Sequence, residues 1–156
     1  MRVAKWHFPD DRLYDEHHQW ALLRGATVRV GITDFGQDTR GDILYLQLPA
    51  PEARAAAGAA VATIETGKWV GRVYAPFGGT VTAVNREAET RPGWINEDPY
   101  GRGWLFEIET TPADGRVPLM KGEAFRAWIE AEARRYLLED PVPGVDGGGE
   151  GQGPGA

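Results

Sequence analysis

The 156-residue chain contains no cysteine. This absence excludes disulfide bonds, a thiolate nucleophile and any cysteine-ligated metal, so sulfur redox chemistry would need a borrowed thiol. The spacing of the histidines, His7, His17 and His18, matches no familiar set of metal ligands, and no carboxylate cluster completes one. We therefore expect no metal site.

The chain also lacks a long apolar segment. Its longest run of small apolar residues, 55–64, is too short to span a bilayer, and residues 1–7 lack the apolar region of a signal peptide. The formal net charge of −6 disfavours binding to nucleic acid or to an anionic membrane through charge alone. We expect a cytoplasmic monomer with neither kind of partner.

Glycine and proline are abundant, with 21 and 11 residues, which indicates many short strands joined by turns. Alternating apolar residues predict strands at 27–32, 44–48, 61–65, 70–74, 79–84 and 104–109. Residues 1–20 look irregular, but they contain aromatic side chains that could pin this segment to a core, namely Trp6, Phe8, Tyr14 and Trp20.

Three helical segments are expected. Thr33 and Asp34 have short side-chain oxygens that can cap a helix ending near Gly41, and a helical turn is predicted at 92–96. The strongest helix is 121–139, where one stripe is apolar, consisting of Phe125, Trp128, Ile129, Tyr136 and Leu137. The pattern predicts one mainly β domain, 1–140, built as a small barrel or sandwich with a C-terminal helix. Residues 141–156 are rich in glycine and proline and are expected to be a disordered tail.

Residues 60–76 predict a hairpin whose turn is Thr66-Gly67-Lys68-Trp69. Gly67 permits a positive φ in that turn. A lysine at a turn tip is held out in solvent, and position alone favours an ordinary surface lysine. The sequence around Lys68 changes this interpretation.

Sequence blocks from Tyr14 to Glu109 resemble the glycine-cleavage H-protein family of lipoyl carriers, and they keep that family's order and spacing. The blocks are His18-Gln19-Trp20, residues 30–35, Gly41-Asp42-Ile43, Leu48-Pro49, Glu65-Thr66-Gly67-Lys68, Tyr74-Ala75-Pro76, Gly79, Val84-Asn85 and residues 96–104. Several blocks are weak individually, but together they are specific.

The resemblance implies a flattened β-barrel of two sheets, the lipoyl (biotinyl/lipoyl hammerhead) fold. It also implies that a lipoate ligase or an octanoyl/lipoyl transferase attaches lipoate to Lys68, reading Glu65 and Gly79. The expected partners are then the P, T and L proteins of glycine cleavage. No general base or nucleophile is evident in the sequence, so we expect a non-catalytic carrier that presents its lysine on a rigid turn.

Two other classes remain open. Biotin carriers share the fold but usually have methionine on both sides of the lysine, whereas Gly67 and Trp69 flank it here. Biotin is therefore the less favoured cofactor. The other class is an unmodified scaffold that has kept the fold and lost the cofactor.

The chain departs from the family pattern near Lys68 and in the loop before Trp20. Around the lysine, the family's Val, Ala, Ser and Asp are replaced by Gly67, Trp69, Gly71 and Arg72. In the loop, Gln19 replaces Glu and His17 precedes the motif. The resemblance places the loop and post-lysine positions near the cleft of the lipoyl arm, so we assign His17, Gln19, Trp69 and Arg72 to the arm and its cargo. Trp69 is expected to make a contact, because an exposed aromatic at a turn tip is unfavourable.

These departures bear on the cargo. Carboxylates would stabilise a cationic aminomethyl group, but Gln19 is neutral and Arg72 is positive. An anionic cargo would fit better, and His17 could add a donor. The sequence therefore favours a paralogue that carries sulfur for a heterodisulfide-reductase-like complex in sulfur oxidation. The alternative is a true glycine-cleavage H protein in which Arg72 points to solvent.

Overall fold

The computed structural model describes residues 1–67 and 69–139 of the chain. Lys68 and the expected disordered tail, 141–156, lie outside the described residues. The strands are β1 Arg2–Val3, β2 Trp6–His7, β3 Leu13–Tyr14, β4 Gln19–Arg24, β5 Thr27–Ile32, β6 Tyr45–Gln47, β7 Arg54–Ala55, β8 Ala60–Glu65, β9 Val70–Tyr74, β10 Gly79–Val84 and β11 Phe106–Glu109. The helices are α1 Asp34–Arg40, α2 Arg86–Thr90, α3 Gly93–Glu97 and α4 Gly122–Glu139, with a 3₁₀ turn at Pro112–Asp114.

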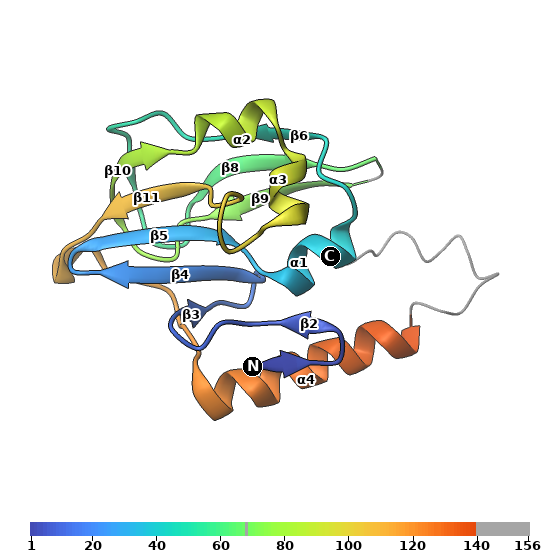
Figure 1. The fold of residues 1–156 in the computed structure, drawn as a ribbon. Coiled ribbons are helices and arrows are strands. Elements are labelled where there is room, and N and C mark those ends of the chain that lie inside the picture. The colour runs from blue at the N-terminus through green and yellow to red at the C-terminus, as the bar shows by residue number, and fades with distance from the viewer. Residues whose placement is uncertain (68, 140–156) are drawn as a thin grey trace.

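Two sheets share one apolar core (Figure 1). The larger has six strands in the order β3-β4-β5-β11-β10-β7, and the smaller has three in the order β6-β8-β9. Inward side chains from both sheets are fully buried together, including Val30, Ile64, Val73 and Ile108. The expected mainly β, two-sheet architecture with a C-terminal helix is confirmed.

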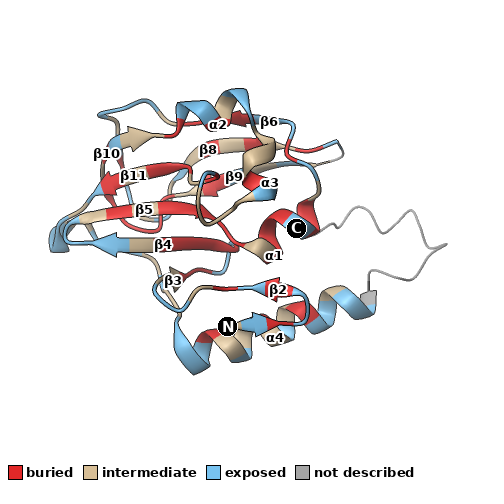
Figure 2. Ribbon diagram, viewed as in Figure 1, coloured by how far each residue is buried: buried red, intermediate tan, exposed pale blue. Residues whose placement is uncertain are grey.

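A second cluster joins the N-terminal segment to α4 (Figure 2). The four N-terminal aromatic side chains are at most 2% exposed, which confirms that they pin this segment to a core. Among them, Tyr14 stacks on Phe125 of α4 with ring centroids 4.1 Å apart. The segment is less irregular than expected, because it forms β1, β2 and β3.

Strand β4 was not predicted, and its burial explains why. Trp20 faces the second cluster while Ala21 faces the main core, so successive side chains are both buried. A strand buried on both faces shows no alternation of apolar and polar residues. The strands with a single buried face, β5, β8, β9 and β10, do show it and were predicted closely.

Two expected segments are shorter in the structure. Strand β6 covers only Tyr45–Gln47, because Leu44 is 49% exposed and does not join the core. Strand β11 begins at Phe106 instead of residue 104. Single backbone hydrogen bonds still continue beyond both strands, from the Leu44 amide to the Glu65 carbonyl oxygen and from the Leu105 amide to the Val30 carbonyl oxygen.

The helix predictions are confirmed at α1, α3 and α4 to within a residue or two, whereas α2 was missed. Thr33 caps α1 by accepting a hydrogen bond from the Gly36 amide at 3.0 Å. The α4 stripe needs one correction, since Leu137 is 48% exposed while Ala133 is buried. In the described parts of the chain, no helix combines the length and apolar character needed to cross a membrane.

Gly79 begins β10 with a φ of +152° and pairs with Ala55 of β7. A Cβ atom at this position would lie 2.2 Å from the Glu109 carbonyl oxygen and 2.7 Å from Ile108 Cγ2. The position therefore needs glycine for close strand approach as well as for its backbone conformation.

We predict that Gly79→Ala lowers the free energy of unfolding by about 2–5 kcal/mol, because it adds a backbone clash to an unfavourable φ. Urea denaturation would measure the loss. Gly115→Ala is the matched control, since Gly115 has a φ of +75° but no atom within 4 Å of its added Cβ. Equal losses in the two variants would contradict the clash.

Candidate functional site

The hairpin that flanks Lys68 is confirmed on both sides of that residue. Strands β8 and β9 are antiparallel, with Glu65 opposite Val70 and Ile64 opposite Gly71. The Thr66 amide donates to the Trp69 carbonyl oxygen at 2.8 Å, which closes the turn. Gly67 is exposed, and its φ lies outside the left-handed region, so the turn does not use the positive φ that glycine permits.

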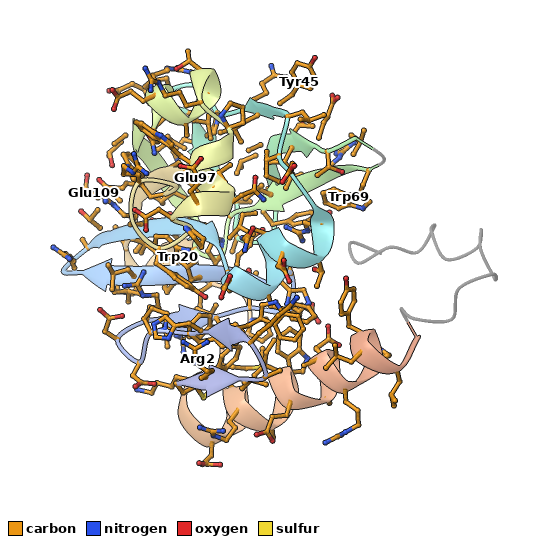
Figure 3. All side chains as sticks on the ribbon, turned by 45° about the vertical axis from the view of Figure 1, so that its right-hand side comes forward. Arg2, Trp20, Tyr45, Trp69, Glu97 and Glu109 are labelled. Atoms are coloured by element: carbon orange, nitrogen blue, oxygen red, sulfur yellow. The ribbon has the colours of Figure 1, made fainter. Side chains whose placement is uncertain are left out.

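Trp69 folds back over its own strand. An added Cβ at Gly71 would lie 1.8 Å from Trp69 Cη2, so the indole occupies the space that any side chain at position 71 would need. The ring is half-buried and packs against the main core, and Figure 3 shows it on the α1 side of the hairpin. The tryptophan at position 69 therefore depends on the glycine at position 71, because any larger residue there would clash with the indole.

Arg40, the last residue of α1, lies beneath this indole. Its Cζ atom is 4.9 Å from the Trp69 ring centroid, within the range of a cation–π contact. Its Nη2 group donates to the His17 carbonyl oxygen at 3.1 Å. Arg40 is only 8% exposed, and burial lowers its pKa to about 10, although the nearby Asp15 opposes that shift.

Sequence reasoning missed Arg40. A basic residue in the last turn of a helix usually lies in solvent and is stabilised by the helix dipole, so nothing in the local pattern marks it. Its burial follows from the loop that crosses the end of α1, which only the tertiary structure shows.

Asp15 fixes the conformation of that loop. Its Oδ1 accepts hydrogen bonds from the amides of His17 at 2.9 Å and Gln19 at 3.1 Å. The side chain is 2% exposed, Oδ2 has no hydrogen-bond partner among the described residues, and burial raises the pKa of the carboxyl to about 6. Asp15 and Arg40 thus bring opposite charges into one poorly solvated region.

Gln19 joins the two sheets. Its Nε2 donates to the Tyr74 carbonyl oxygen at 2.7 Å, and the Tyr74 amide donates to its Oε1 at 2.8 Å. The side chain is 1% exposed and acts as an extra pairing partner for the edge strand β9. A carboxylate here could accept from the amide but could not donate to the carbonyl.

The other residues assigned to the arm separate into two groups. The His17 ring is exposed and stacks on the Tyr74 ring at 4.2 Å, so His17, Gln19 and Trp69 gather along the free edge of β9. Arg72 does not join them. It is exposed, pairs with Thr63, and points to the face opposite Gly71 because successive strand residues alternate.

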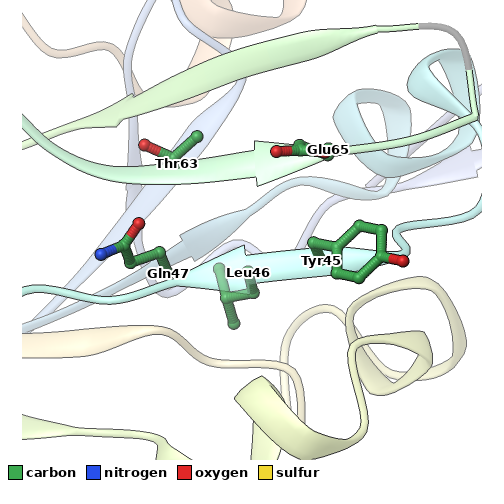
Figure 4. A pocket seen from close by; sticks show the side chains of 5 residues that line it. All are labelled: Tyr45, Leu46, Gln47, Thr63 and Glu65. Carbon is green, nitrogen blue, oxygen red and sulfur yellow. The ribbon is translucent and has the colours of Figure 1, made fainter.

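The outer face of the three-stranded sheet carries the remaining predicted residue, Glu65. Tyr45, Glu65 and Val70 lie side by side across β6, β8 and β9, and Tyr45 and Val70 are 67% and 66% exposed. A shallow hollow beside Glu65 is lined by Tyr45, Leu46, Gln47, Thr63 and Glu65 (Figure 4). Two residues of this exposed face, Glu65 and Val70, flank the turn that contains Lys68 in the sequence.

The described side chains do not assemble a metal site. Among residues 1–67 and 69–139, no group of three or more His, Cys, Asp and Glu side chains could hold a metal ion.

The steric contact between Trp69 and Gly71 predicts that substitutions at these two positions have strongly non-additive effects on the free energy of unfolding. Gly71→Ala should cost about 1–3 kcal/mol of stability in the wild-type background and much less in a Trp69→Ala background, because the clash partner is then gone. Chemical denaturation of the four proteins in this double-mutant cycle measures the coupling. Gly67→Ala serves as control, since no atom lies within 4 Å of its added Cβ. Additive losses would refute the close contact.

The Asp15 carboxyl predicts a pH dependence of stability. Its pKa of about 6 in the folded protein exceeds the ordinary value of 3.8, so folding takes up a proton between these values. The free energy of unfolding should therefore gain a contribution of about 2–3 kcal/mol as the pH falls from 7 to 4, and Asp15→Asn should lose that contribution. Urea denaturation of both proteins across this range measures it. Parallel pH profiles would contradict the prediction.

Comparison with known proteins agrees with this geometry. The model of the Glycine cleavage H-protein family matches residues 12–132. A glycine cleavage system H protein of Thermus thermophilus is 40% identical over 80% of this chain and 98% of that protein. One from Corynebacterium jeikeium is 45% identical over 76% and 94%. The crystal structure of the Mycobacterium marinum H protein matches with a TM-score of 0.72 and 32% identity, covering 78% of this chain and 98% of that one. The chain therefore belongs to the glycine cleavage H-protein family.

Proposed function

We propose that this protein is a non-catalytic lipoyl carrier with lipoate linked through an amide to Lys68. The observation that carries the proposal is the β8–β9 hairpin. In the sequence, Lys68 lies in the turn between these strands, and both strands are paired in the sheet. A lysine presented on a rigid hairpin can enter the narrow active site of a larger enzyme.

The described residues fit such a modification. Gly67 is exposed beside Lys68, and the outer face next to it is open along Tyr45, Glu65 and Val70. A lipoate ligase or octanoyl/lipoyl transferase could therefore approach from this side and contact Glu65. Gly79 is buried between β7 and β11, so its contribution to modification would come through folding. When attached, the dithiolane supplies the redox-active sulfur that this cysteine-free chain lacks.

The cargo we propose is the aminomethyl group of glycine cleavage, exchanged with the P, T and L proteins. The match to the glycine cleavage H-protein family supports this choice over the sulfur-carrying paralogue that the sequence analysis favoured. The Gln19 amide also supports this choice, because it hydrogen-bonds to the Tyr74 backbone and is not free to meet a cargo. Arg72 points to the opposite face from Trp69 and Gly71, so it does not set the charge of that side.

Co-expression with a lipoate ligase tests the attachment. The chain has three lysines, Lys5, Lys68 and Lys121. We expect one lipoyl adduct by intact mass on the wild type and on the Lys5→Arg and Lys121→Arg controls, and none on Lys68→Arg. An adduct that survives Lys68→Arg, or a wild type that stays unmodified, would overturn the proposal.

Glycine–bicarbonate exchange by glycine decarboxylase tests the cargo. The lipoylated protein should support exchange, and Lys68→Arg should support none, because the decarboxylase needs the dithiolane to accept the aminomethyl group. The lipoylated Thermus thermophilus relative serves as positive control. If that relative supports exchange and the lipoylated wild type does not, the aminomethyl cargo is wrong and the sulfur-carrying alternative is favoured.

A further inference from the structure

Arg40 places a positive charge where packing alone would not require one. It is 8% exposed, and within the described residues only its Nη2 makes a hydrogen bond, while Nη1 is buried without a partner. The nearest opposing charge, Asp15, is not within ion-pair distance. Burial of a charge with so few partners is unfavourable, and an apolar side chain of similar size would often be more stable.

The contacts of Arg40 lead directly to the strand that follows Lys68. The guanidinium lies against the Trp69 indole, and that indole covers Gly71 of β9. On its other side, Arg40 donates to the carbonyl oxygen of His17, in the loop that Asp15 holds in place. Arg40 therefore connects the start of β9 to the loop that precedes β4.

The far end of β9 is held by the same loop. Gln19 pairs with both backbone groups of Tyr74, and His17 stacks on the Tyr74 ring. Strand β9 is an edge strand of its sheet, so β8 is its only strand partner in the described structure. Arg40 contacts Trp69 at the end of β9 that follows Lys68, and the Tyr74 contacts hold the opposite end of the strand.

We propose that Arg40 is a positioning residue for the attachment hairpin. By holding the Trp69 indole over Gly71, it fixes the strand that follows the attachment turn, so that the modifying enzyme meets a turn with one rigid side. This inference rests on the proposed lipoyl attachment at Lys68.

The chemistry of arginine explains the choice of residue. Its planar guanidinium stacks on an indole face and at the same time donates a hydrogen bond in its own plane, which here reaches the His17 carbonyl. Lysine offers a point charge with no plane to stack, and methionine offers no donor. Arg40→Lys should therefore keep only part of the function, and Arg40→Met should lose it.

Steady-state lipoylation by a purified ligase tests the proposal, with the full-length unmodified chain as the varied substrate. Arg40→Met should lower kcat/KM by about tenfold to a hundredfold, because a turn without a rigid side positions its reacting group less well once bound. The loss should appear mainly in kcat, and Arg40→Lys should be intermediate. Arg24→Met is the matched control, since Arg24 is exposed at the end of β4 away from Gln19, and it should stay close to the wild type.

Hydrogen–deuterium exchange of the unmodified proteins gives a second readout that needs no lipoate. In Arg40→Met, the amides at the start of β9 should exchange about tenfold faster or more, while those of β5 stay protected. Only the contacts of residue 40 with the Trp69 indole and the His17 carbonyl oxygen are lost, so the opening is local. If wild-type and Arg40→Met proteins are modified at equal rates and show equal exchange in β9, the proposal is overturned. If Arg40→Met does not fold, Arg40→Lys must show the intermediate kcat loss, while Trp69→Phe, which keeps an aromatic face for the guanidinium, must stay close to the wild type. A wild type that is never lipoylated defeats the proposed function, while the exchange result still decides whether Arg40 holds β9.

Discussion

The two hydrogen bonds between the Gln19 amide and the Tyr74 backbone are the link on which the attachment side of the molecule depends. They join β4 of the larger sheet to the free edge of β9 in the smaller one. Because the amide both donates and accepts, it satisfies two backbone groups that would otherwise be left unpaired at a buried edge. His17 stacks on the Tyr74 ring beside these bonds, and Arg40, which donates to the His17 carbonyl oxygen, contacts Trp69 at the other end of β9.

Much of the fold could be predicted, because strands with one buried face leave a clear alternation in the sequence. The hairpin around Lys68 and strand β5 are of this kind, and Thr33 identified the start of α1 by its capping side chain. Strand β4 could not be found in this way, since Trp20 and Ala21 are buried on opposite faces. Alternation of apolar and polar residues marks the buried face of a strand only where the opposite face is exposed to solvent.

The candidate site was predictable in position but less so in its contacts. The family resemblance identified Lys68 and its neighbours, but it placed neutral Gln19 and positive Arg72 together at the cleft of the lipoyl arm. The structure turns Arg72 to the outer face and uses Gln19 to bridge the sheets. Arg40 and Asp15 left no local signal, because the burial of a charged side chain depends on segments far away in the sequence.

The indole of Trp69 resting on Gly71 also constrains how this turn could have arisen. A chain with serine at position 71 has no room for that indole, whereas a chain with glycine at 71 and alanine at 69 meets no clash. Starting from the family's Ala and Ser, the order that avoids the clash places glycine at 71 first and tryptophan at 69 second. The return to the family pattern avoids the clash when tryptophan is lost before glycine.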